Sequence, residues 1–108
     1  MEYKFTKDNF ETEVLKSDKL VLIDFYADWC GPCRTMGPVV DQIAKDYEGK
    51  VKVGKINVDE EQEIAAQFGI RSIPCFVFMK DGEVAAHVVG AVPSDERTYR
   101  IDELTKAA

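Results

Sequence analysis

The sequence lacks an excess of positive charge. It has 14 lysines and arginines against 20 aspartates and glutamates, which gives a net charge of -6, and the basic residues are scattered along the chain. A surface that binds phosphate groups needs clustered lysine and arginine side chains. We therefore expect no nucleic-acid partner and no anionic membrane partner.

A long apolar run is also missing from the start of the chain. The first residues, MEYKFTKDNF, include the charged side chains of Glu2, Lys4, Lys7 and Asp8. A signal peptide or a membrane-spanning helix needs a much longer apolar segment. These features favour a cytoplasmic protein that does not associate with membranes.

Cysteine and histidine are scarce, with three cysteines and one histidine among 108 residues. Only Cys30 and Cys33 are close in the sequence, so the disulfide framework of a small secreted protein is not expected. In a reducing cytosol, a Cys-x-x-Cys pair either binds a metal or takes part in catalysis. A structural zinc ion needs about four ligands, and only Cys75 and His87 are left to complete such a site. We therefore expect no bound metal.

The chain length and an apolar content of 45% are enough for one hydrophobic core, and we expect residues 1–108 to form a single domain. Residues 19–27 are almost continuously apolar, which predicts a strand covered on both faces. Apolar residues then recur at helical spacing from Met36 to Tyr47, and residues 51–59 predict a second strand. A strand, a helix and a strand in this order predict a parallel pair.

The remaining segments predict two further strands and three further helices. Residues 75–80 and 83–89 are apolar runs joined by Asp81 and Gly82, which is typical of a tight antiparallel hairpin. The predicted helices lie in residues 5–17, capped by Thr6 or Asp8, in residues 60–69, and in residues 94–108. The expected fold class is α/β, with a mixed sheet between helices.

The two neighbouring cysteines lie where the first predicted strand ends and a helix begins. A sulfur atom at this place lies near free backbone N–H groups and the positive end of the helix dipole, which favour thiolate over thiol. Cys30 is therefore the expected nucleophile, and Cys33 can resolve a mixed disulfide from the same face of the helix. Cysteines that merely pack are disfavoured by the adjacent Trp29 and by the rigid Gly31-Pro32 segment between the thiols.

Three motifs resemble those of the thioredoxin family: ADWCGPC at residues 27–33, RSIP at residues 71–74 and VVGAVP at residues 88–93. The similarity extends from about Phe5 to Pro93. It implies the thioredoxin fold, in which a central mixed sheet of four to five strands is flanked by four helices. It also implies a cis peptide bond before Pro74.

The resemblance further implies a dithiol reductase that reduces disulfides of oxidised protein substrates and is itself reduced by an NADPH-dependent flavin enzyme, thioredoxin reductase. We expect no cofactor bound to the chain, and a monomer. An oxidase or isomerase with the same fold is a rival, which Gly31, Pro32 and the missing signal peptide disfavour. A binding module with incidental thiols is a rival of a different class.

The resemblance also implies a flat apolar patch around Cys30 that binds an extended substrate segment as an added strand. Its members are Trp29, Gly31, Pro32 and Pro74, which support the active site, and Ile73, Val89, Gly90 and Ala91, which bind substrate. Taken singly, Ile73 and Val89 are more often core residues, and Gly90 more often marks a bend.

Asp24 and Lys55 resemble the family's buried acid and its lysine partner. Because a buried carboxylate is costly in its charged form, we expect Asp24 to hold a proton more firmly than an exposed carboxylate unless Lys55 compensates. Our hypothesis is that Asp24 accepts the proton of Cys33 when this thiol attacks the mixed disulfide. The alternative is a purely structural pair of Asp24 and Lys55.

Two parts of the chain depart from the family pattern. Cys75 follows Pro74 where the family commonly has threonine, and we expect a buried, unreactive thiol with a raised pKa and no catalytic role. Arg97 and Arg100 replace apolar residues of the last helix, so we expect this helix to be weakly anchored. His87 is expected to be an exposed strand residue without a ligand or catalytic role.

Overall fold

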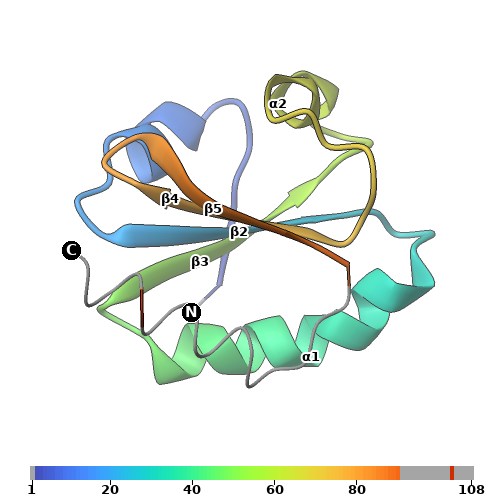
Figure 1. Cartoon of the computed structure of the whole chain (residues 1–108), viewed down its shortest axis with the longest axis horizontal. Helices are drawn as coiled ribbons and strands as arrows, with labels where there is room; N and C mark the ends of the chain where they lie inside the picture. Colours follow the sequence, from blue (N-terminus) through green and yellow to red (C-terminus); the bar gives the residue numbers. More distant parts are fainter. Residues whose placement is uncertain (1, 91–102, 104–108) are drawn as a thin grey trace.

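Five strands form one mixed sheet in the order β1-β3-β2-β4-β5 in the computed structural model, which describes residues 2–90 and 103 (Figure 1). The strands are β1 (Tyr3–Lys4), β2 (Leu20–Tyr26), β3 (Val51–Asn57), β4 (Cys75–Lys80) and β5 (Glu83–Val89). The described residues contain three helices: η1 (Glu11–Leu15), α1 (Gly31–Asp46) and α2 (Gln62–Gln67). The predicted α/β class and mixed sheet are confirmed.

The strand pairing confirms both motifs that the apolar pattern predicts. β2 and β3 pair in parallel, with Asp24 opposite Lys55, and are connected through α1. β4 and β5 form the antiparallel hairpin, whose turn places Asp81 at φ 54° and Gly82 at φ 81°. These left-handed conformations are the ones for which an Asp-Gly turn is suited.

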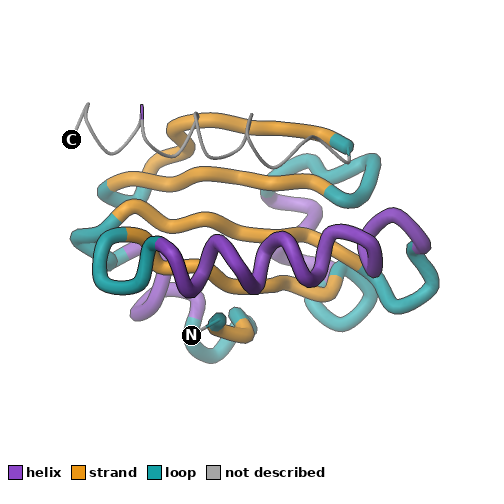
Figure 2. The backbone as a smooth tube through the Cα atoms, turned by 90° about the horizontal axis from the view of Figure 1, so that it is seen from below, coloured by secondary structure: helices purple, strands orange, loops and turns teal. Residues whose placement is uncertain are grey.

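The helices cover the sheet from both sides. α1 lies along one face, while η1 and α2 lie on the other (Figure 1), and Figure 2, which views the molecule from below, shows α1 in front of the sheet and running roughly along the direction of the strands. Side chains of β2 alternate between the two layers, as a buried strand requires. Val21, Ile23 and Phe25 pack in the core below η1 and α2, whereas Leu20 and Leu22 pack in the core against α1.

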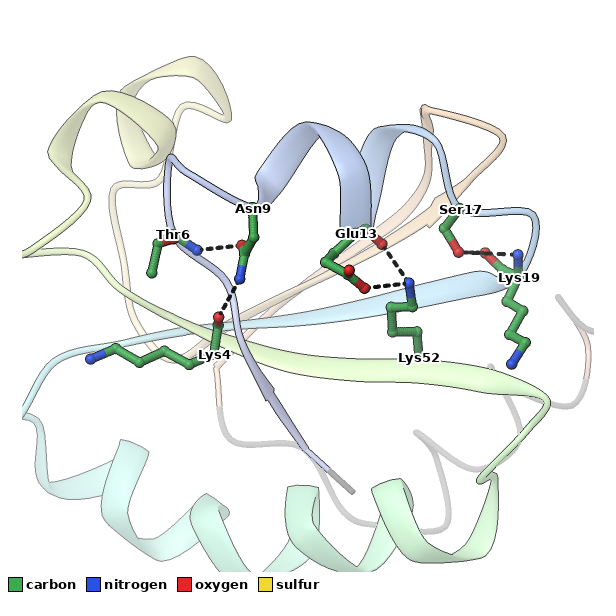
Figure 3. Close-up of polar contacts among 7 residues, drawn as sticks. All are labelled: Lys4, Thr6, Asn9, Glu13, Ser17, Lys19 and Lys52. Atoms are coloured by element: carbon green, nitrogen blue, oxygen red, sulfur yellow. Dashed lines mark hydrogen bonds and ion pairs between the residues drawn. The ribbon is translucent and has the colours of Figure 1, made fainter.

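The N-terminal helix differs from its prediction. η1 is a short π-helix preceded by Phe10, and no side chain caps it, so the predicted caps at Thr6 and Asp8 are wrong. Instead the Asn9 side chain stabilises the turn before the helix, since it accepts a hydrogen bond from the Thr6 N–H (2.8 Å) and donates one to the Lys4 carbonyl (3.0 Å) (Figure 3). A short turn held by these hydrogen bonds therefore stands where the sequence predicted the first turn of a helix.

A lysine of the sheet fixes η1 in place. The Lys52 ammonium group donates to the backbone carbonyl of Glu13 at 3.0 Å and to its carboxylate at 2.9 Å (Figure 3). The side chains of Lys52 and Glu13 are partly buried, 15% and 31% exposed, so this pair is better protected from water than a fully exposed ion pair. The contact ties η1 to β3.

The predicted C-terminal helix lies almost wholly outside the described residues. Glu103 alone of residues 94–108 is described, and it is helical and exposed. The predicted weak anchoring of this segment, including the effect of Arg97 and Arg100, stays a prediction. Within residues 2–90 and 103, no helix has the length and apolar character needed to cross a membrane.

Gly54→Ala is expected to lower the free energy of unfolding by about 1–3 kcal/mol, the usual effect of overpacking a core. A Cβ atom at position 54 would overlap the ring of Phe5, which is fully buried. Urea denaturation measures the effect, with Gly37→Ala as the control because an added Cβ at this helical glycine meets no atom within 4 Å. Equal stability of Gly54→Ala and the unmodified chain would contradict the packing argument.

Candidate active site

The cysteine pair lies at the junction between β2 and α1. Cys30 is the N-cap of α1, with extended backbone geometry, and its sulfur accepts a hydrogen bond from the Cys33 N–H at 3.2 Å. Cys30 and Cys33 form a disulfide with Cα atoms 5.3 Å apart. The two residues are only 4% and 6% exposed. The structure therefore presents a mostly buried disulfide, and this disulfide lies at the predicted strand–helix junction.

The electrostatic surroundings of this junction favour a thiolate when the disulfide is reduced. α1 is 16 residues long, and its first turn contains no acidic residue that would oppose the positive end of the helix dipole. The Cys33 N–H that points at the Cys30 sulfur is one of the free donors of the helix start. Both features stabilise negative charge on Cys30.

A second segment, containing a cis peptide bond between Ile73 and Pro74, lies beside the disulfide. The Cys30 sulfur is 3.9 Å from the Ile73 carbonyl oxygen, and the partly buried Ile73 side chain packs against the cysteines. The N–H of Gly90 donates to the Pro74 carbonyl at 2.8 Å, which brings the end of β5 to the same place. The predicted cis bond is thus confirmed.

The residues of the predicted apolar patch differ in their exposure. Trp29 is 67% exposed and Val89 is 55% exposed, while Gly31 and Pro32 are also exposed. Pro74 is buried, and Gly90, at φ 93°, is partly buried. Ala91 lies outside the described residues. The structure thus surrounds a buried disulfide with exposed apolar side chains from separate segments of the chain.

Asp59 holds Trp29 in place, which the sequence analysis did not predict. The indole N–H of Trp29 donates to the Asp59 carboxylate at 2.9 Å. A signal for this contact exists in the topology, because Tyr26 and Asn57 are register partners at the ends of parallel β2 and β3. Residues that follow the two strands therefore emerge side by side.

Asp24 and Lys55 are neighbours on β2 and β3 and share a cavity with the active-site helix. Asp24 is 2% exposed, and the Lys55 side chain is 31% exposed. The cavity has a volume of about 280 Å³ and is lined by Asp24, Lys55 and Cys33, among others. The Lys55 ammonium group also lies 5.5 Å from the centroid of the Tyr26 ring. Sequence reasoning predicted the neighbours, and the structure adds the cavity that joins them to Cys33.

Two further acidic groups lie close to Lys55 and were not predicted. Glu2 Oε1 is 3.8 Å from the Lys55 ammonium group. Burial and a hydrogen bond with Asp41 raise the pKa of Glu2 to about 8, against the opposing effect of Lys55. The same hydrogen bond lowers the pKa of Asp41. No apolar pattern marks Glu2 or Asp41, because their proximity depends on how the residue before β1 lies relative to α1.

Cys75 is buried on the other side of the cis bond. It is a free cysteine, 1% exposed, and its sulfur lies 3.0 Å from Nε2 of His87 on β5. Burial raises the pKa of the Cys75 thiol to about 11, and the negative charge of Asp24 acts in the same direction. The predicted burial and raised pKa are confirmed, and His87 is exposed as expected, although its contact with Cys75 was not foreseen.

The described residues, 2–90 and 103, form no metal-binding cluster. No group of three or more histidine, cysteine, aspartate or glutamate side chains in this part of the chain has the arrangement needed to hold a metal ion. Cys75 and His87 approach each other, but the third and fourth ligands of a zinc site are missing around them in the described residues.

Cys75→Thr is expected to leave disulfide reduction unchanged, because a buried thiol with a raised pKa has little thiolate at neutral pH. In the native, oxidised protein, a thiol reagent should label one cysteine slowly, and mass spectrometry should locate the label on Cys75. Unfolding the protein should make this labelling fast. Fast labelling of the native protein, or a disulfide that includes Cys75, would contradict the inert assignment.

A disulfide at a strand–helix junction, next to a cis-proline segment on a mixed sheet, defines a thiol–disulfide oxidoreductase with the thioredoxin fold. The family model described as Thioredoxin matches residues 2–103. The chain is 52% identical over 101 residues to "Thioredoxin" of Chlorobaculum thiosulfatiphilum, covering 94% of each chain. It is 57% identical over 98 residues to "Thioredoxin 1" of a Nostoc species, covering 91% of this chain and 92% of the relative.

These comparisons agree with the geometry of the site. The chain belongs to the thioredoxin family. It is a protein-disulfide oxidoreductase, and Cys30 and Cys33 are its redox-active pair.

Proposed function

We propose that the chain is a dithiol reductase in which Cys30 attacks and Cys33 resolves. The thiolate of Cys30 attacks one sulfur of a substrate disulfide, the substrate S–S bond breaks, and the departing substrate sulfur takes up a proton. Cys33 then loses its proton and attacks the Cys30 sulfur, which releases the second substrate sulfur as a thiol. Two electrons pass from the cysteine pair to the substrate, and the Cys30–Cys33 disulfide remains; the two substrate thiols take up two protons from solvent, which balance the proton that Cys30 loses on ionising and the proton that Cys33 loses on attack.

The observation that carries this assignment of roles is the difference between the two sulfurs. The Cys30 sulfur accepts the Cys33 N–H and faces the Ile73 carbonyl, on the side of the exposed apolar residues. Cys33 lines the cavity that contains Asp24. One sulfur therefore adjoins the surface where a substrate would bind, and the other adjoins a group that can accept a proton.

Asp24 is the proposed proton acceptor for Cys33, and Lys55 is the proposed partner that stabilises its carboxylate. The shared cavity has room for water, so the proton can pass through an ordered water molecule between the thiol and the carboxylate. The register of β2 and β3, which sets Asp24 opposite Lys55, supports the pairing. In this role Asp24 takes the proton that Cys33 must lose in the second step.

The proposed substrate surface consists of Ile73, Val89, Gly90 and Ala91, supported by Trp29, Gly31, Pro32 and Pro74. An extended substrate segment would form backbone hydrogen bonds beside Ile73 and place apolar side chains on the exposed residues. Main-chain pairing gives affinity without requiring one sequence. This surface suits a reductase that acts on many oxidised proteins.

The proposed cycle closes when a thioredoxin reductase, a flavin enzyme that uses NADPH, reduces the Cys30–Cys33 disulfide. We further propose that the chain works as a monomer, as one domain over residues 1–108, and in the cytoplasm.

The test of this cycle is a coupled assay that follows NADPH consumption with thioredoxin reductase, the chain and insulin. Consumption should rise in proportion to the concentration of the chain and should stop when either insulin or the reductase is left out. Cys75→Thr serves as a substituted control that retains the activity. The proposed reductase is wrong if no NADPH is consumed while the same chain still reduces insulin with dithiothreitol as the electron donor.

A further inference from the structure

Glu2 links the N-terminal segment to the Asp24 cavity through Lys55. Its side chain is 16% exposed, and one of its oxygens lies 3.8 Å from the Lys55 ammonium group. The other oxygen, Oε2, is buried and has no hydrogen-bond partner among the described residues. A buried carboxylate oxygen without a donor is costly, so the geometry disfavours an ionised Glu2.

Asp41 of α1 supplies the missing contact once Glu2 carries a proton. Two carboxylates cannot bond to each other, but a carboxylic acid donates a hydrogen bond to a carboxylate. Glu2 and Asp41 line a common cavity of about 170 Å³ at the side of α1. The hydrogen bond between them raises the pKa of Glu2, after burial, and lowers that of Asp41. Glu2 is the member that holds the proton.

Lys55 is shared between this carboxyl pair and Asp24. Its ammonium group contacts Glu2 on one side, and its residue lies opposite Asp24 in the sheet and lines the Asp24 cavity. A neutral Glu2 leaves the positive charge of Lys55 to Asp24, whereas an ionised Glu2 competes for it and adds a negative charge nearby. The described charged groups that act on the pair are Asp24, Lys45 and Lys55.

We propose that Glu2 is a positioning residue for proton transfer at Asp24: with Glu2 protonated and hydrogen-bonded to Asp41, Lys55 stabilises the Asp24 carboxylate, and ionisation of Glu2 withdraws this support. The inference rests on the proposed role of Asp24 as proton acceptor of Cys33. It adds a residue outside the active-site cavity whose ionisation changes the pH at which Asp24 loses its proton.

Carboxyl carbon NMR of the oxidised protein tests this coupling. Glu2 should titrate near pH 8 instead of near its ordinary pKa of 4.5. In Glu2→Gln, the part of the Asp24 titration that accompanies ionisation of Glu2 near pH 8 should disappear, because a neutral amide cannot compete for Lys55 above that pH. In Asp24→Asn, the midpoint of Glu2 should fall, because coupling between two sites is reciprocal.

Glu60→Gln is the matched control. Glu60 also pairs with a lysine of the N-terminal segment, since its carboxylate is 3.4 Å from the Lys4 ammonium group, but both side chains are more than half exposed. This variant makes the same exchange of glutamate for glutamine at an exposed site and should leave the Asp24 titration unchanged. Titration of Glu2 near 4.5, or the same Asp24 titration curve in Glu2→Gln and Glu60→Gln, would overturn the inference.

The pH profile of insulin reduction gives a second readout that a purely structural role would not move. The rise in turnover with pH should be complete at lower pH in Glu2→Gln than in the unmodified chain, and Glu60→Gln should match the unmodified chain. An identical profile in Glu2→Gln would overturn the inference. If Asp24→Asn leaves turnover unchanged while the NMR coupling persists, the proton-acceptor role fails and the carboxyl coupling stands, so the two failures are distinguishable.

Discussion

Cys30→Ser is expected to lower the rate of disulfide reduction to the background rate. Cys33→Ser is expected to complete the first attack and to remain as the mixed disulfide with the substrate. A serine hydroxyl at position 30 cannot form the mixed disulfide, because the attacking group must be a thiolate. Without Cys33, the mixed disulfide on Cys30 has no neighbouring thiol to release it. The stalled intermediate should therefore accumulate only in Cys33→Ser.

Mass spectrometry of the two variants after incubation with an oxidised protein substrate measures this outcome. Cys33→Ser should gain the mass of one substrate chain, reversibly by dithiothreitol, and peptide mapping should place the link on Cys30. Cys30→Ser, which still contains Cys33 and Cys75, is the matched control and should gain no such mass. Trapping of substrate by Cys30→Ser would reverse the proposed order of attack.

Asp24→Asn is expected to slow turnover by roughly 10- to 100-fold at neutral pH, at or below the lower end of the usual contribution of a general base. The amide cannot accept the proton of Cys33. The free energy of unfolding should stay the same or rise. Residue 24 is only 2% exposed, and a neutral amide at this position avoids the cost of burying a charge. Steady-state insulin reduction and urea denaturation measure the two effects.

Asp46→Asn is the control for this substitution. Asp46 is exposed at the C-terminal end of α1, at the opposite end of the helix from Cys33, so its loss changes the net charge without affecting the cavity. It should turn over insulin at the unmodified rate. Unchanged turnover in Asp24→Asn across neutral pH would leave Asp24 with a structural role only.

Most of the fold could be predicted because its signals are local. The nearly continuous apolar run of β2, the helical spacing after Cys33 and the Asp81-Gly82 turn each specify an element within a few residues. β1 could not be predicted from the pattern, because two residues are too short to show an alternation, and it exists through pairing of Tyr3 with Gly54. The start of η1 was predicted wrongly because Asn9 forms the turn that Thr6 or Asp8 was expected to cap.

The active site could be predicted in part for the same reason. The position of Cys30 and Cys33 at a strand–helix junction follows from the sequence, and the cis bond before Pro74 follows from the family resemblance. The contacts of Trp29 with Asp59 and of Cys75 with His87 depend on which residues the sheet brings together. Such contacts require the strand register, which no local motif contains.

Reduction of insulin by dithiothreitol, followed as turbidity, tests the central claim most directly. The account predicts that the unmodified chain accelerates precipitation of the insulin B chain in proportion to its concentration, and that the Cys30→Ser, Cys33→Ser double variant gives the rate of dithiothreitol alone. Circular dichroism of the double variant confirms that it is folded. Absence of acceleration by the unmodified chain, or equal acceleration by the folded double variant, would contradict the assignment of this chain as a dithiol reductase acting through Cys30 and Cys33.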